Sequence, residues 1–224
     1  MPQSVPLTVS SSSARTGPGS RYPLWIRIGF WVCIIIAVAA VLRRLFALVY
    51  PATSGPEQLL SLDAGFASRT GLTLVHILSA MGFVVIVPFA FWRKTASKGW
   101  PYTLLFPLGA VVGITAFAMS RFAVGGWTER SAVLLFDSLF LLSLGRAFVY
   151  RRRQRVSLAR GWLARATGIM LGIATTRPVM GIFFATSRLT HLQPNQFFGI
   201  AFWIGFSINL TIMELWLRKR QHAI

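Results

Sequence analysis

The stretch ATGIMLGIATTRPVMGIFFAT, residues 166–186, decides how the rest of the chain is interpreted. It is apolar and about long enough to cross a bilayer, which takes roughly 20 residues. Its one charge, Arg177, lies at the middle of the stretch, where a cation is costly and rarely left without a partner. Pro178 follows at once and removes the helical hydrogen bond to the carbonyl of Ala174. We therefore expect a kinked membrane helix here, with a buried polar site beside it.

The composition of the whole chain indicates membrane insertion. Of the 224 residues, 54% are hydrophobic and 12% are charged, and the mean hydropathy is +0.62. Soluble domains average about 25% charged residues, so we interpret the chain as an integral membrane protein. The net charge of +18 would suggest nucleic acid in a soluble chain. Here the basic residues flank apolar runs, as they do in membrane proteins, and we expect no nucleic-acid partner.

Apolar runs of spanning length recur along the chain. Because lipid cannot satisfy backbone polar groups, such runs form helices, and the expected fold is an all-α bundle of six transmembrane helices. The spans are expected at residues 24–42, 71–92, 102–120, 132–150, 166–186 and 196–216. Ala37-Val38-Ala39 in the first run resembles a signal-peptide cleavage site. That run is longer than a signal core of roughly 7–15 residues, so we expect an uncleaved first span.

The remaining segments are short. Residues 1–23 are rich in Ser, Pro and Gly, which predicts a disordered N-terminal tail because they cannot bury a core. Residues 24–217 form the expected transmembrane domain, and residues 218–224 form a basic C-terminal tail. The one cysteine, Cys33, excludes a disulfide within the chain and a cysteine-based metal site.

Basic residues are distributed unevenly over the segments that join the spans. Sixteen of the 23 Lys and Arg fall on the side that holds both termini, whereas six, with Glu57, Asp63 and Glu129, fall on the other side. Because Lys and Arg concentrate on the cytoplasmic side, we predict that both termini lie in the cytoplasm, in a bacterial inner membrane. One arginine run either attracts anionic lipid or acts only as a topology signal. It consists of Arg151, Arg152, Arg153 and Arg155.

Polar residues within the spans fall into two layers when depth is taken as 1.5 Å per residue. The outer-to-middle layer contains His76, Asp137, Arg177 and Asn209. The inner layer pairs Glu214 with Arg146 or Arg165. Two interpretations stay open for these residues. One is a polar pocket for a ligand, proton or cofactor, and the other is pairwise neutralisation that fixes helix packing.

Histidine placement bears on a possible haem. His76 lies within a span, whereas His191 and His222 fall in a loop and in the tail. A bis-His b-type haem is therefore not favoured, although a His–Met site stays open. The chain has no phosphate-binding loop or hydrolase motif. We expect a non-enzymatic protein, either a small-molecule or proton pathway or an accessory subunit of a membrane complex. The alternative is a membrane redox protein that binds a b-type haem or a quinone near His76.

Three features carry a family resemblance. They are His76 early in a span, Trp162 and Arg165 in GWLAR, and the Asn209-Leu210-x-x-x-Glu214 pattern of the last span. Over roughly residues 71–217 this pattern resembles a bacterial family of multi-pass membrane proteins known only as domain of unknown function 2306. The resemblance implies a helical membrane fold and no settled activity. Family members usually have two further histidines, where this chain has SKGWPY and Ala159. A metal or haem site built on those histidines is therefore not expected here.

Overall fold

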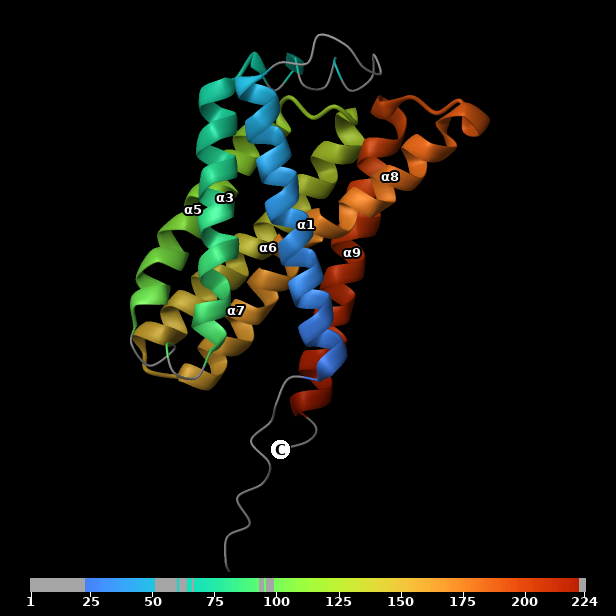
Figure 1. The fold of residues 1–224 in the computed structure, drawn as a ribbon. Coiled ribbons are helices and arrows are strands. Elements are labelled where there is room, and N and C mark those ends of the chain that lie inside the picture. The colour runs from blue at the N-terminus through green and yellow to red at the C-terminus, as the bar shows by residue number, and fades with distance from the viewer. Residues whose placement is uncertain are drawn as a thin grey trace, which may run out of the picture.

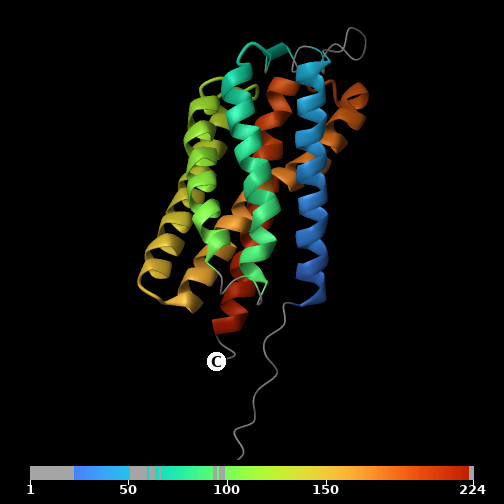
Figure 2. The same cartoon turned by 60° about the vertical axis from the view of Figure 1, so that its left-hand side comes forward.

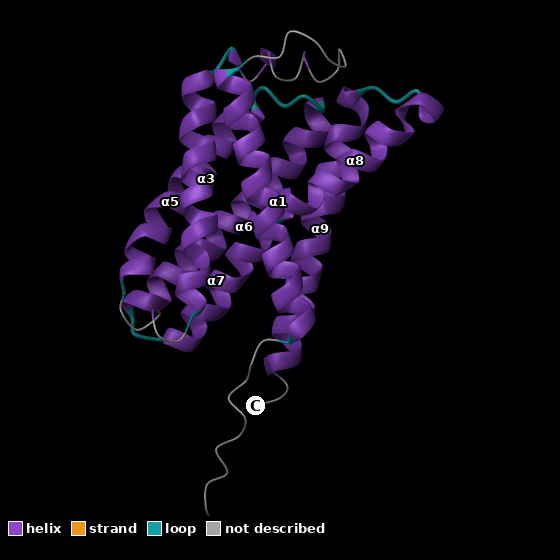
Figure 3. Cartoon of the chain, viewed as in Figure 1, coloured by secondary structure: helices purple, strands orange, loops and turns teal. Residues whose placement is uncertain are grey.

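The computed structural model describes residues 23–50, 60, 64–65, 67–92, 95 and 99–221. All regular structure in this part of the chain is helical (Figure 3). Several features interpreted from the sequence lie outside the described residues. They are the tail 1–22, Glu57, Asp63, Arg93, Lys94, Lys98 and His222.

The helices follow one another as up-and-down segments of a bundle (Figure 1). They are α1 (Leu24–Val49), α3 (Thr70–Phe91), α5 (Trp100–Ser120), α6 (Gly126–Arg152), α7 (Val156–Met170), α8 (Gly172–Thr190) and α9 (Pro194–Gln221). α7 and α8 run on from one another and together form one candidate span. Within the described residues, six segments are therefore long and apolar enough to cross a membrane. This confirms the predicted all-α membrane bundle.

The start of α1 and the end of α9 lie at the same end of the bundle (Figures 1 and 2). We call this the terminal end. The turn between α6 and α7, which carries Arg153 and Arg155, also lies there, whereas the α5–α6 turn lies at the opposite end. This arrangement agrees with an even number of spans. Assignment of the terminal end to the cytoplasm stays a prediction from charge.

Several helix boundaries differ from those expected from the sequence: α1 continues seven residues past the expected 42, and α7 begins ten residues before the expected 166. α6 begins at Gly126, six residues before the expected 132. The predicted fifth span is interrupted at Leu171, whereas α8 continues through Pro178. At the interruption the N–H of Ala174 donates to the carbonyl of Leu171 at 3.0 Å, three residues back. A three-residue bond tightens the turn relative to an α-helix, and this separates α7 from α8.

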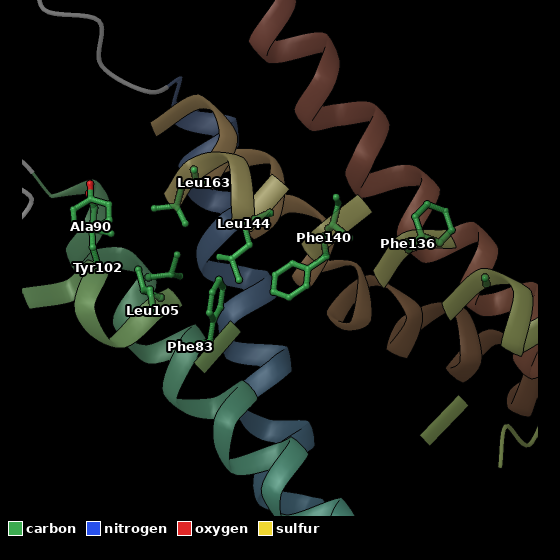
Figure 4. Packing of buried hydrophobic residues seen from close by; sticks show 13 residues of the cluster. Phe83, Ala90, Tyr102, Leu105, Phe136, Phe140, Leu144 and Leu163 are labelled. Carbon is green, nitrogen blue, oxygen red and sulfur yellow. The ribbon is translucent and has the colours of Figure 1, made fainter. Parts of the chain in front are cut away.

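The main apolar cluster fills the space between α3, α5, α6 and α7 (Figure 4). Phe83, Leu105, Phe140, Leu144 and Leu163 are its large members, and each is at most 4% exposed. Phe83 and Phe140 meet edge to face, with ring centroids 5.8 Å apart, a preferred aromatic geometry. These side chains form a packed apolar core between the four helices.

Glycines bring α9 against α6 and α8. A Cβ placed on Gly199 would lie 2.6 Å from the backbone nitrogen of Glu129, and one on Gly205 would lie 2.7 Å from that of Thr176. Only a residue without a side chain allows such an approach. Gly109 and Gly113 of α5 act similarly, since both pack against leucines of α6. Close glycine contacts thus fix the helices that carry the polar residues below.

A candidate binding cavity

A cavity of about 250 Å³ lies in the half of the bundle away from the terminal end. Side chains from α1, α3, α5, α6, α7, α8 and α9 line it. Most of the wall is apolar and includes Met81, Phe136 and Phe206. The ionisable residues that line it are Arg44, His76, Glu129, Asp137 and Arg177. Three of the four residues assigned to the outer-to-middle layer therefore share one cavity.

His76 projects from α3 toward α5. Its Nδ1 lies 2.9 Å from the hydroxyl oxygen of Thr115. That hydroxyl has one proton, and it donates to the carbonyl of Val111 at 2.6 Å. We therefore assign the His76 proton to Nδ1, which donates to Thr115. In this tautomer Nε2 carries a lone pair, and His76 is one of the residues that line the cavity.

Asp137 is buried at the middle of α6, with 9% of its surface exposed. Its Oδ2 has no hydrogen-bond partner among the residues that the structure describes. An unsatisfied buried acceptor costs about 1–3 kcal/mol, and more when it is charged. Such groups at a cavity wall are typical of functional sites. Asp137 is thus the strongest indication that the cavity receives a ligand.

Glu129 is the site residue that sequence reasoning missed, because it was assigned to a loop and used only for topology. It lies in the first turn of α6 and is 9% exposed. Its Oε2 accepts the N–H of Gly125 at 2.6 Å, and a carboxylate is favoured at a helix N-terminus. Asp137 follows eight residues later, about 12 Å along the helix axis. The pair Gly125-Gly126 before Glu129 is the sequence feature that marks this early helix start.

Arg177 extends from α8 into the cavity and is exposed in the isolated chain. Glu129 attracts its guanidinium, whereas Arg43 and Arg44 of α1 repel it. Within the described residues, Arg177 and Asp137 line the same cavity without forming an ion pair within 4 Å. The guanidinium keeps its proton. The cavity therefore presents a cationic pole at Arg177 and a separate acceptor pole at Asp137.

Asn209 does not line this cavity. Its Oδ1 accepts the hydroxyl of Thr175 at 3.2 Å, and Cys33 Sγ lies 3.9 Å from that same hydroxyl oxygen. Asn209 lines a second hollow, in the terminal half of the bundle. The depth of Asn209 suggested a shared layer with Arg177, but Asn209 lies about one turn closer to the terminal end than Phe206, the cavity-lining residue on the same face of α9.

Glu214 lies apart from the cavity and pairs with Arg165, one of its two expected partners. Arg165 Nε lies 2.5 Å from Oε1, and Arg165 Nη2 lies 3.2 Å from Oε2. The other expected partner, Arg146, lies over the ring of Trp162 at 4.8 Å. Among the described residues, no group of three His, Cys, Asp or Glu side chains is placed to hold a metal ion.

Comparison with known proteins gives no family assignment. No protein-family model, no curated protein and no solved structure matches the chain.

Proposed function

We propose that this multi-pass membrane protein binds a small molecule in the cavity and forms part of a small-molecule pathway. The observation that carries the proposal is Asp137, whose Oδ2 is buried without a partner among the described residues and which lines the same cavity as Arg177 and His76. Intramembrane ionisable groups that face a cavity typically mark substrate pathways. Entry is from the end opposite the termini, since the lining residues come from that half of the bundle.

The chemistry of the wall defines the ligand class. Asp137 and His76 Nε2 require a hydrogen-bond donor, and Arg177 requires an acceptor or an anion. The apolar remainder, which includes Phe202 and Phe206, favours a hydrocarbon or aromatic body. The volume of about 250 Å³ is below the roughly 300–1,000 Å³ of drug-sized sites. We infer a small amphiphile with an amine and a carboxylate, about the size of an aromatic amino acid.

A proton pathway is less favoured than a binding site. Toward the terminal end the apolar cluster of Phe83, Leu105, Phe140 and Leu163 is at most 2% exposed and offers no hydrogen-bonding group. The haem form of the redox alternative is also less favoured at this position, because a porphyrin macrocycle is larger than the cavity. An accessory role in a larger complex is compatible with ligand binding, and its partner is not defined by these residues.

The family resemblance is kept as part of the proposal. Two of its motifs supply Arg165 and Glu214, which pair with each other, and this contact gives a physical reason for the motifs to occur together. We also propose that the terminal end faces the cytoplasm of a bacterial inner membrane, where Arg151, Arg152, Arg153 and Arg155 contact anionic lipid. The basic bias of that end supports this orientation.

The test uses three probes that share one ring. L-phenylalanine carries both charged groups, phenylacetate carries the acid alone, and phenethylamine carries the amine alone. We expect L-phenylalanine to raise the melting temperature of the purified protein most, because bound ligand stabilises the folded state. Asp137→Leu should abolish the shift by phenethylamine, and Arg177→Met should abolish the shift by phenylacetate.

Ser138→Ala is the matched control. Ser138 adjoins Asp137 on α6 but is exposed, and its hydroxyl donates to the carbonyl of Leu134 at 2.7 Å. The control should keep all three shifts. No shift by any probe, or equal shifts in wild type and Asp137→Leu, contradicts the proposed ligand class.

A further inference from the structure

A groove of about 810 Å³ opens in the terminal half of the bundle. α1 and α3 form one wall, and α7 and α9 form the other. Its lining is largely apolar and includes Phe30, Val85, Ile212 and Met213. The groove is distinct from the binding cavity, because the packed residues Ile34, Ala37, Leu171 and Ala174 lie between α1 and α8 there.

The groove is accessible sideways from the lipid because α1 is attached loosely. Ile34 and Ala37 are the buried residues of this 26-residue helix. Trp25 and Trp31 of α1 line the groove and are each more than 50% exposed. Figure 2 shows α1 (blue) as the outermost helix on its side in the terminal half of the bundle. A hydrophobic molecule in the bilayer can therefore enter beside α1 without crossing water.

The deep end of the groove offers a hydrogen-bond donor. Asn209 Oδ1 accepts from Thr175, whereas its Nδ2 is buried, makes no hydrogen bond of ordinary length with the residues that the structure describes, and has the Cys33 thiol as a neighbour. Cys33, beside Thr175, adds a weak thiol donor. A ligand at this point must therefore supply an oxygen acceptor.

Charge along the groove restricts that acceptor further. Among the described lining residues, Arg27 is the only charged one, and it lies in the first turn of α1 near the terminal end. Asn209 lies near the middle of α9, well inside the bilayer. A carboxylate or phosphate at Asn209 would be buried without a counter-ion at its own depth, since Arg27 lies near the terminal end, and such burial is costly. A phospholipid ester would draw its charged headgroup to the same depth.

We propose that this groove binds one isoprenoid quinone. A quinone has a flat, uncharged head with carbonyl acceptors and a long apolar tail. One carbonyl accepts from Asn209 Nδ2, and the tail lies along Phe30, Val85 and Met213 toward the tryptophans at the terminal end. The site differs in place from the binding cavity around His76, and neither proposal depends on the other.

Tryptophan fluorescence supplies the measurement, because quinones quench indole emission at short range. Trp25, Trp31, Trp92 and Trp216 line the groove. Decylbenzoquinone titrated into the purified protein should quench saturably. Decylbenzene, which has the tail but no carbonyl, should fail to displace it. Loss of the bond in Asn209→Leu should weaken quinone binding about three- to tenfold, as expected for one neutral hydrogen bond.

A second variant blocks the groove without changing Asn209, Thr175 or Cys33. A Cβ on Gly29 would meet no atom within 4 Å, and Gly29 lines the groove. Gly29→Leu should therefore fold normally and fill the ligand's place. Gly145→Leu is the matched control, since Gly145 of α6 is equally open and lies outside the groove lining. We expect saturable quenching to disappear in Gly29→Leu and to persist in Gly145→Leu.

Three results would overturn the proposal. One is equal displacement by decylbenzene, which would reduce the groove to a hydrocarbon surface. Another is displacement of the quinone by phosphatidylglycerol at equal concentration, which would indicate a phospholipid site. The third is unchanged quenching in Gly29→Leu. If Asn209→Leu does not fold, the comparison of quenching in Gly29→Leu with quenching in Gly145→Leu tests the proposal by itself.

Discussion

Arg165 of α7 and Glu214 of α9 form a two-point ion pair, with Nε on Oε1 and Nη2 on Oε2. Their side chains are 19% and 31% exposed, so the pair is neither fully buried nor free in solvent. The Arg165 guanidinium also lies 4.6 Å from the ring centre of Trp162, in cation–π geometry. The pair holds α7 against α9 near the terminal end, and we interpret its role as structural.

Changes at Glu214 should affect stability and leave ligand binding intact. Glu214→Gln keeps one hydrogen bond and should lower stability modestly, whereas Glu214→Leu should cost about 1–3 kcal/mol. Arg165→Met combined with Glu214→Leu should recover part of that loss, because no charge is left unpaired. Thermal unfolding in detergent measures each variant. Loss of the phenylalanine-induced shift in a stably folded Glu214→Gln protein would assign Glu214 to the ligand pathway instead.

Gly205 should tolerate no side chain, because α9 touches the backbone of α8 there. In Gly205→Ala the new methyl would lie 2.7 Å from the nitrogen of Thr176, and relief requires a helix shift costing about 1–3 kcal/mol. Gly181→Ala on α8 is the control, since its Cβ would meet no atom within 4 Å. It should gain up to about 1 kcal/mol from helix propensity. Similar unfolding temperatures for the two variants would contradict the close approach of α8 and α9.

The sequence predicts the spans well, because each is a continuous apolar run of bilayer length. It also predicts that His76, Asp137 and Arg177 lie at one depth, where the structure places them around one cavity, since depth follows directly from position along a helix. It misplaces Asn209, because a depth counted from the expected ends of a span is inexact by about one helical turn, and Asn209 lies that much closer to the terminal end than the cavity-lining Phe206. It misses Glu129, because the apolar run begins only after the polar first turn of α6. The direction of each side chain around its helix axis depends on packing between helices, which one sequence does not specify.

Orientation of the bundle can be measured with reporter fusions. Fusions after Arg153, in the basic α6–α7 turn, and after Ala123, in the α5–α6 turn, should report opposite sides of the membrane. The expected cytoplasmic side is that of Arg153, from the excess of basic residues at the terminal end. Two fusions that report the same side would invalidate the six-span arrangement. If the two fusions report opposite sides and the fusion after Ala123 is cytoplasmic, the six spans stand and only the predicted orientation is wrong.

The relation between Asp137 and Arg177 separates two accounts of the polar residues. In the pairing hypothesis drawn from the sequence they are counter-ions. Removing either charge would then leave the other buried and unpaired, which would lower stability by roughly 3–5 kcal/mol. In the structure they share the cavity walls without an ion pair, and Asp137 Oδ2 has no partner within the described part of the chain. The structure therefore predicts a different outcome for the same pair of substitutions.

Asp137→Leu should stabilise the ligand-free protein, because it removes an unsatisfied buried acceptor that costs about 1–3 kcal/mol and breaks no hydrogen bond or ion pair with the described residues. The effect of Arg177→Met on the free energy of unfolding should be the same with and without Asp137→Leu. The coupling energy from the double mutant should stay below about 0.5 kcal/mol, the lower bound for side chains in direct contact. Thermal unfolding of the wild type, both single variants and the double variant in one detergent gives this value.

Two destabilised single variants with partial recovery in the double variant would restore the ion pair and remove Asp137 as the ligand's acceptor. A more stable Asp137→Leu that no longer responds to phenethylamine would show that the carboxylate is kept at a cost in stability because it binds the ligand.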